Sequence, residues 1–214
     1  MSPPPRPPVN WRARLAGMAA VLLIVSGAAT AGAAALTQRH APQPGRDAAG
    51  ATASARGPRL ARSEPVAVAI PAIGVRSSLL HLGLNADGTI QVPSVDNRPM
   101  EAAWYKYSVT PGQIGSAVIE GHVDTLRGPA VFFRLGALRP GNSIDVILAN
   151  GVTAVFRVTG VREYAKDDFP TRTIYGTSHY AALHLITCGG AFDFSTGHYL
   201  SSTVVFASLV SSRR

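Results

Sequence analysis

From Pro65 onward the sequence consists of short apolar runs rich in β-branched residues, separated by turn-forming residues at intervals of about ten. Such runs are typical of strands, because helices need longer segments in which apolar residues recur about every 3.6 residues. The clearest runs are 66–70, 116–122, 143–149, 153–161, 183–188 and 203–210. The sequence therefore predicts an all-β fold for residues 65–214.

Three dipeptides mark turns between these runs: Asn150-Gly151, Asp87-Gly88 and Pro140-Gly141. An Asn-Gly pair between two alternating segments is a strong hairpin signal, because both residues tolerate a positive φ. Helical periodicity is scarce, and only residues 101–107 and 130–138 are predicted to form short helices. We therefore expect a β-barrel with one or two short helices.

The net charge of +8 is concentrated in the N-terminal part of the chain. Residues 1–64 contain 8 Lys and Arg against 2 Asp and Glu, a net charge of +6, whereas residues 65–214 contain 12 against 10, a net charge of +2. A domain so close to neutral lacks the basic surface typical of nucleic-acid binding. We expect no nucleic-acid partner.

The N-terminal 36 residues predict either a membrane anchor or a signal peptide. Residues 15–36 carry no charge and would span about 33 Å as a helix, enough for a hydrocarbon core of about 30 Å. Arg6, Arg12 and Arg14 precede this span, so residues 1–14 are expected on the cytoplasmic side. Small residues at 33–35 fit a cleavage site equally well. Both alternatives place the following domain outside the cytoplasm.

Residues 37–64 are rich in Ala, Pro, Gly and Arg and contain almost no large apolar side chains. Such a segment cannot bury a core of its own, so we expect a flexible tether. The predicted domain order is thus a cytoplasmic segment (1–14), an anchor or signal peptide (15–36), a tether (37–64) and the β-domain (65–214).

Cys188 is the only cysteine in the chain, and it ends the apolar run 183–188 just before Gly189 and Gly190. A lone cysteine outside the cytoplasm is either an inert buried side chain or a reactive thiol. The position favours the reactive thiol, because the glycines let a substrate approach the backbone beside the predicted strand end.

A nucleophilic thiol needs a partner that moves protons, and this partner is most often a histidine. His122 is the best placed of the six histidines, because it ends the apolar run 116–122 before a predicted loop. Two strands that end at the same rim of a barrel would bring His122 and Cys188 into one groove. The remaining histidines, in the tether or beside polar segments, are His40, His81, His179, His184 and His198.

Other cysteine chemistries fit less well. The histidine precedes the cysteine, whereas in papain-like proteases the cysteine comes first, and a caspase motif is absent. One cysteine with dispersed histidines and no carboxylate cluster provides no metal-ligand set. We expect neither a metal nor another cofactor.

The segments "LITCGG" around Cys188 and "EGHVDT" around His122 resemble the signature segments of sortases, membrane-anchored cysteine transpeptidases of Gram-positive bacteria. The resemblance is greatest to the class E/F sortases of actinobacteria. It extends through "IPAIGVRSSLLHLGLNADGTIQVP", "GPAVFFRLGALRPG", "REYAKDDFPT" and "TCGGAFD", so that it covers most of residues 66–210. It implies a closed, eight-stranded sortase β-barrel.

The resemblance also implies a mechanism. Cys188 would be the nucleophile that forms an acyl-thioester with a Leu-Pro-x-Thr-Gly-like sorting signal, and His122 would be the general acid and then the general base. The acyl group would pass to an amine on a cell-wall precursor or a pilin lysine. The protein would be a single-pass membrane protein whose catalytic domain is extracytoplasmic.

One sortase element is missing from the sequence. Sortases carry an arginine after the cysteine loop, which holds the substrate and stabilises the oxyanion, but residues 189–212 contain neither Arg nor Lys. Leu200 occupies the position of that arginine. Possible substitutes are Arg127, Arg134 and the backbone N–H groups of Gly189 and Gly190, while Asp124 would orient His122 or serve only in a turn.

Three functions remain open from the sequence. The first is a working transpeptidase, with reduced activity because the arginine is absent. The second is a catalytically weak sortase fold that binds peptide or wall polymer, and the third is a hydrolytic cysteine peptidase.

Overall fold

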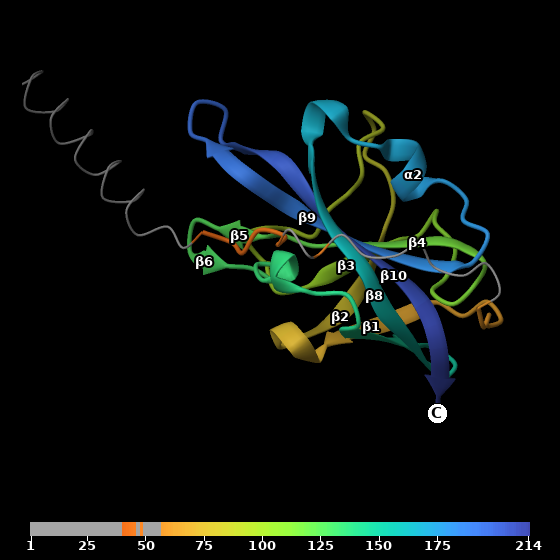
Figure 1. The fold of residues 1–214 in the computed structure, drawn as a ribbon. Helices are drawn as coiled ribbons and strands as arrows, with labels where there is room; N and C mark the ends of the chain where they lie inside the picture. Colours follow the sequence, from red (N-terminus) through yellow and green to blue (C-terminus); the bar gives the residue numbers. More distant parts are fainter. Residues whose placement is uncertain (1–39, 46–47, 49–56) are drawn as a thin grey trace, which may run out of the picture. The chain divides into compact units, whose positions relative to one another are not determined.

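The computed structural model describes residues 40–45, 48 and 57–214. Eight strands form a closed barrel in the order β1-β2-β3-β4-β9-β10-β8-β7, and β5 pairs with β6 in a separate small sheet (Figure 1). The barrel strands are β1 (Pro65–Ile70), β2 (Val75–Leu82), β3 (Ala102–Tyr105), β4 (Gly115–Glu120), β7 (Ser143–Leu148), β8 (Thr153–Ala165), β9 (Ala181–Asp193) and β10 (His198–Arg213). The predicted all-β, eight-stranded barrel is confirmed.

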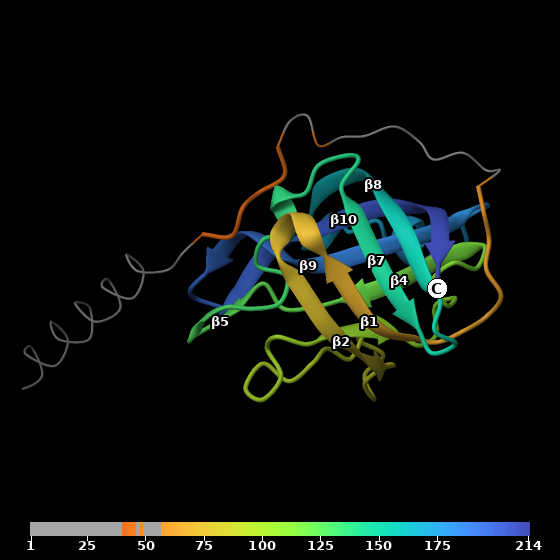
Figure 2. The same ribbon diagram turned by 90° about the horizontal axis from the view of Figure 1, so that it is seen from below.

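Apolar side chains that alternate with polar ones along the strands fill the core of the barrel. In β7, Ile144, Val146 and Leu148 are buried in the main hydrophobic cluster, while Asp145 between them pairs with Arg213 of β10. A strand presents successive side chains to opposite faces, so one apolar face is enough to fill the interior. Figure 2 shows β1 lying between β2 and β7, its two antiparallel partners.

A second hydrophobic cluster lies on the outside of the barrel wall. Val118 of β4, Ile186 of β9 and Val204 of β10 pack there against Ile174. Ile174 belongs to α2 (Thr171–Tyr175), which follows the 3-10 helix η4 (Lys166–Asp168) in the connection between β8 and β9 (Figure 1). We call the surface of β4, β9 and β10 on this side of the wall the outer face.

The short helices differ from those predicted. Residues 101–107 contain β3, which pairs with both β2 and β4, so the predicted helix is wrong there. Within residues 130–138 only the 3-10 helix η3 (Leu135–Ala137) forms, and the sequence did not predict α2. The Asn150-Gly151 hairpin is confirmed, because β7 and β8 pair across it and Gly151 has φ of 80°.

The predicted anchor at residues 15–36 and the segment 1–14 lie outside the described residues. Among the residues that are described, no helix is both long enough and apolar enough to cross a membrane. The domain boundaries at residues 14, 36 and 64 therefore stay predictions.

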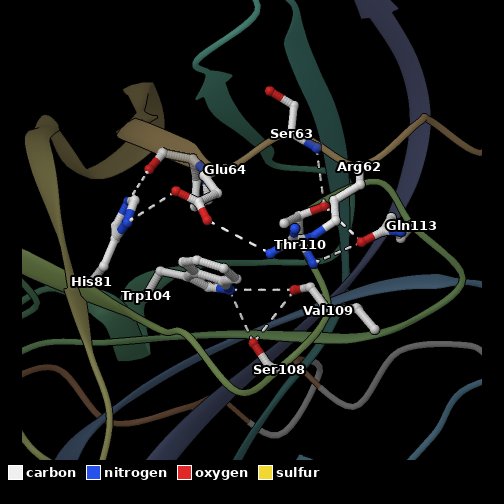
Figure 3. Close-up of polar contacts among 10 residues, drawn as sticks. Arg62, Ser63, Glu64, His81, Trp104, Ser108, Val109, Thr110 and Gln113 are labelled. Carbon is white, nitrogen blue, oxygen red and sulfur yellow. Dashed lines mark hydrogen bonds and ion pairs between the residues drawn. The ribbon is translucent and has the colours of Figure 1, made fainter.

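Part of the predicted tether contacts the barrel. Ala48 is fully buried in the main cluster, and the backbone N–H of Leu60 donates to the Gly112 carbonyl at 2.8 Å. Figure 3 shows the contacts that follow: Ser63 N–H donates to Thr110 Oγ1 at 3.3 Å, and Glu64 pairs with His81 at 3.6 Å. The segment just before Pro65 is thus tied to the domain.

Candidate active site

Cys188 lies within β9 and not at its end, because the strand continues to Asp193. This corrects the predicted strand end, and the reason is β10, which pairs with β9 on both sides of the cysteine through Ser202↔Cys188 and Tyr199↔Phe192. By alternation Cys188 shares the face of Ile186, so its partly buried thiol belongs to the outer face.

His122 follows β4, the parallel neighbour of β9. Glu120 pairs with Ile186, and Gly121 N–H donates to the Ile186 carbonyl at 3.1 Å. Because the two strands run parallel, both chains continue in the same direction beyond the last pair, Glu120↔Ile186, to His122 and to Cys188, each two residues further on. The β4–β9 register thus brings the two predicted site residues to the same end of the barrel.

One nitrogen of the His122 ring is already occupied. Its Nε2 lies 2.6 Å from the Pro93 carbonyl oxygen. A carbonyl oxygen only accepts hydrogen bonds, so Nε2 must carry a proton and donate it. The other nitrogen, Nδ1, is therefore the one left to exchange protons with a substrate.

Burial raises the pKa of the Cys188 thiol above its ordinary value. A positive charge and a side-chain hydrogen bond from Lys166 act in the opposite direction, while the carboxylates of Asp124 and Glu120 add to the rise. Because the effect of burial is the largest of these, the resting thiol is protonated more than a free cysteine would be.

Lys166 was not predicted as a site residue. It is the first residue of η4, directly after β8, and it is one of only two lysines in the sequence. The one available signal was its place in "REYAKDDFPT", a segment of the sortase resemblance. Its contact with Cys188 depends on strand pairing that the sequence does not reveal.

Asp124, at the start of β5 (Asp124–Thr125), accepts a hydrogen bond from the hydroxyl of Tyr199 on β10. This contact joins β5 to the strand beside the cysteine. Burial, together with the hydrogen bond and the charge of Asp124, raises the pKa of Tyr199. The tyrosine is thus a neutral donor, and Asp124 has a partner different from the predicted His122.

Two buried polar contacts hold α2 against the outer face. The hydroxyl of Tyr175 donates to Glu120 Oε1 at 2.7 Å, and Nδ1 of His184 donates to the Ile174 carbonyl at 2.7 Å. Burial raises the pKa of Glu120 and lowers that of His184, so both side chains favour their neutral forms. These two contacts tie α2 to β4 and β9.

Side chains of β10 pack closely over Gly189 and Gly190, so neither position has room for a side chain. A Cβ at Gly189 would lie 2.5 Å from Thr203 Oγ1, and Gly190 adopts a φ of +74° that favours glycine. The N–H of Gly190 donates to Oε1 of Gln43 at 3.4 Å. An amide oxygen thus already occupies one of the two backbone donors predicted as oxyanion groups.

Arg127 and Arg134, which were predicted to replace the missing arginine, lie on other segments than Lys166. Arg127 lies in the turn between β5 and β6 (Gly128–Pro129), where its N–H bonds Thr125 Oγ1, and Arg134 caps η3. Neither is among the groups that shift the Cys188 pKa. Leu200 is 54% exposed, at the irregularity between Tyr199 and Ser201 in β10.

Several solved structures share this fold. Sortase C1 of Streptococcus agalactiae is 20% identical with a TM-score of 0.51, over 68% of this chain and 66% of that one. Listeria monocytogenes sortase A is 16% identical with a TM-score of 0.52, over 70% and 89%, and Actinomyces oris sortase C-1 is 19% identical with a TM-score of 0.51, over 69% and 74%. This chain thus spans slightly less than two thirds of the first of these. No curated protein matches it significantly.

The sequence itself matches a family model. The model describes the Sortase domain, and residues 68–210 match it, from β1 to the last third of β10. This range includes six barrel strands whole, most of β10 and half of β1, together with Cys188 and His122. Because the match covers more than half of the chain, the protein belongs to the sortase family.

Proposed function

We propose that this protein is a membrane-anchored cysteine transpeptidase of the class E/F sortase type. It cleaves a Leu-Pro-x-Thr-Gly-like sorting signal and transfers the cleaved protein to an amine. The observation that carries the proposal is the parallel β4–β9 pairing within a sortase domain, because these two strands lead to His122 and Cys188 in the same direction.

The reaction has two halves. The Cys188 thiol gives its proton to Nδ1 of His122, and the thiolate attacks the threonine carbonyl carbon of the signal. A C–S bond forms, and the carbonyl oxygen takes the negative charge. As this intermediate collapses, the Thr–Gly C–N bond breaks, and the leaving amine takes a proton from His122. An acyl-thioester on Cys188 and a neutral histidine remain.

The second half returns the enzyme to its starting state. An incoming amine attacks the thioester carbon and gives a proton to His122, a C–N bond forms, and the C–S bond breaks to release the thiolate, which takes the proton back from His122. Because Nε2 of His122 is bound to the Pro93 carbonyl, Nδ1 carries the proton in both halves.

The class E/F assignment and the location rest on the sequence. The motifs "EGHVDT" and "TCGGAFD" support the class, and the uncharged span 15–36 supports a single-pass anchor with the catalytic domain outside the cytoplasm. The donor is then a surface protein that bears a sorting signal. The acceptor is an amine of a cell-wall precursor or a pilin lysine.

The test is peptide transfer by the full-length protein in detergent. Incubation with a Leu-Pro-x-Thr-Gly peptide and an excess of triglycine should give the transfer product, and Cys188→Ala should abolish it. His122→Ala should reduce the rate by about 10²–10⁴-fold, the usual contribution of a general acid–base group. Hydrolysis that persists at high amine concentration would indicate a peptidase, and peptide binding without turnover would indicate a binding module.

A further inference from the structure

We infer that Lys166 is a catalytic residue that supplies the positive charge for Cys188 and for the oxyanion, the role of the arginine that β10 lacks. The inference rests on the proposed transpeptidase function. Lys166 lies in the segment that follows β8, whereas the missing arginine would lie on β10.

Strand pairing places Lys166 on the side of the thiol. Tyr164 of β8 pairs with Ser202 of β10, and Ser202 pairs with Cys188 of β9, so the three residues form one row across the sheet. Tyr164 packs in the outer-face cluster. Lys166 follows Tyr164 by two residues, as the first residue of η4, and η4 packs against β10, the strand beside Cys188.

The surroundings of Cys188 require a cation there. Among the described residues, the ionisable groups besides Lys166 that interact with the thiol are Asp124 of β5, Glu120 of β4 and Tyr199 of β10. The two carboxyl groups raise the pKa of the thiol, and the neutral Tyr199 supplies no positive charge. Residues 189–212 contain neither Arg nor Lys, so β10 offers no compensating charge before Arg213, which pairs with Asp145.

Lys166 acts on the reacting thiol. Its charge and a side-chain hydrogen-bonding contribution both lower the pKa of Cys188 against the effect of burial. An ammonium group has three donors and no acceptor, so it can bind the thiolate and then the developing oxyanion while it remains protonated. No bond to Lys166 forms or breaks in either half of the reaction.

A lysine and an arginine hold a substrate oxygen in different ways. The guanidinium of an arginine binds an oxygen through a rigid fork, whereas an ammonium is a compact point charge on a flexible stem. We therefore expect Lys166 to act mainly on the charge of the transition state and less on substrate positioning. Its loss should lower kcat much more than it raises KM.

The experiment compares Lys166→Ala, Lys166→Arg and Lys106→Ala in the full-length protein. Lys106 is the other lysine of the chain, it lies over the Tyr107 ring, and its replacement makes the same change in net charge. The first measurement is the rate of Cys188 alkylation by iodoacetamide as a function of pH. It needs no peptide, so it remains informative if the protein does not cleave sorting signals.

The alkylation profile of Lys166→Ala should move to higher pH, while those of Lys166→Arg and Lys106→Ala stay close to wild type. With a cleaved peptide, kcat of Lys166→Ala should fall by about 10²–10³-fold, the usual cost of one oxyanion donor. An alkylation profile of Lys166→Ala that coincides with wild type and Lys106→Ala would overturn the inference.

Discussion

At the scale of single residues, Glu120 is the least expected group of the site. It is a buried carboxyl on the strand that leads to His122, and its one hydrogen-bond donor is Tyr175. Its pKa is raised by burial, so the folded state holds the proton more tightly than the unfolded state. This contribution to stability is present at acidic pH and is lost as the pH rises through the raised folded-state pKa.

Glu120→Gln should therefore raise the melting temperature at pH 8 by about 2–4 °C, which corresponds to about 1 kcal/mol in a domain of this size. The amide oxygen still accepts from Tyr175, and no carboxylate has to be buried. Calorimetry between pH 5 and pH 8 should show the difference from wild type growing with pH. Asp96→Asn, at an exposed aspartate, is the control, and a Glu120→Gln protein less stable at every pH would contradict the assignment.

The sequence predicted the nucleophile and its partner because both end apolar runs and the chain has a single cysteine. It did not predict Lys166 or the Asp124–Tyr199 contact. Both depend on which strands are neighbours, and Tyr199 is 75 residues from Asp124. Local patterns determine where strands form, whereas pairing between distant strands depends on packing over the whole barrel.

At the scale of elements, residues 41–45 lie beside the site. The segment reads Ala-Pro-Gln-Pro-Gly, with proline and glycine at the positions they hold in Leu-Pro-x-Thr-Gly. The Gln43 side chain accepts the Gly190 N–H, and the carbonyl of Pro42 lies so close to Gly136 that a Cβ there would come within 2.0 Å. The segment thus occupies backbone that a substrate would approach.

Gln43→Ala should free the Gly190 N–H and increase the rate of iodoacetamide alkylation of Cys188 by about two- to threefold, as expected for the loss of one neutral hydrogen bond of about 0.5 kcal/mol. Gln43→Glu keeps an acceptor and adds a negative charge near the thiol, so it should not increase the alkylation rate. Equal alkylation rates for Gln43→Ala and wild type would show that the segment does not shield the site.

Strand pairing also explains why the helix predicted at residues 101–107 does not form. The run "EAAWYKY" contains good helix formers, yet β3 forms there because it lies between β2 and β4 and buries Trp104 in the barrel core. Tertiary pairing overrides a weak local preference in a segment this short. α2 was missed for a related reason, since its five residues depend on Ile174, His184 and Glu120 for their position.

At the scale of the whole molecule, the folded unit begins before β1. Leu60 packs on the main cluster and donates to Gly112, and Glu64 accepts from Ala149 N–H at 2.8 Å. A chain that begins at residue 65 should therefore unfold at lower urea concentration than one that begins at residue 57.

In the chain that begins at residue 57, Leu60→Ala should lower the free energy of unfolding by about 1–2 kcal/mol, because the Leu60 side chain is only partly buried. Urea denaturation followed by tryptophan fluorescence measures the free energy of unfolding in each case. Identical midpoints for the two chain lengths would mean that residues 57–64 add nothing to the fold.

The most direct test of the catalytic account is mass spectrometry of the full-length protein after incubation with a Leu-Pro-x-Thr-Gly peptide and no added amine. We expect an adduct of the Leu-Pro-x-Thr acyl group on Cys188, which hydroxylamine removes and which Cys188→Ala does not form. A peptide that is cleaved with the acyl group on another residue, or an unmodified Cys188 in a protein that only binds the peptide, would contradict the account.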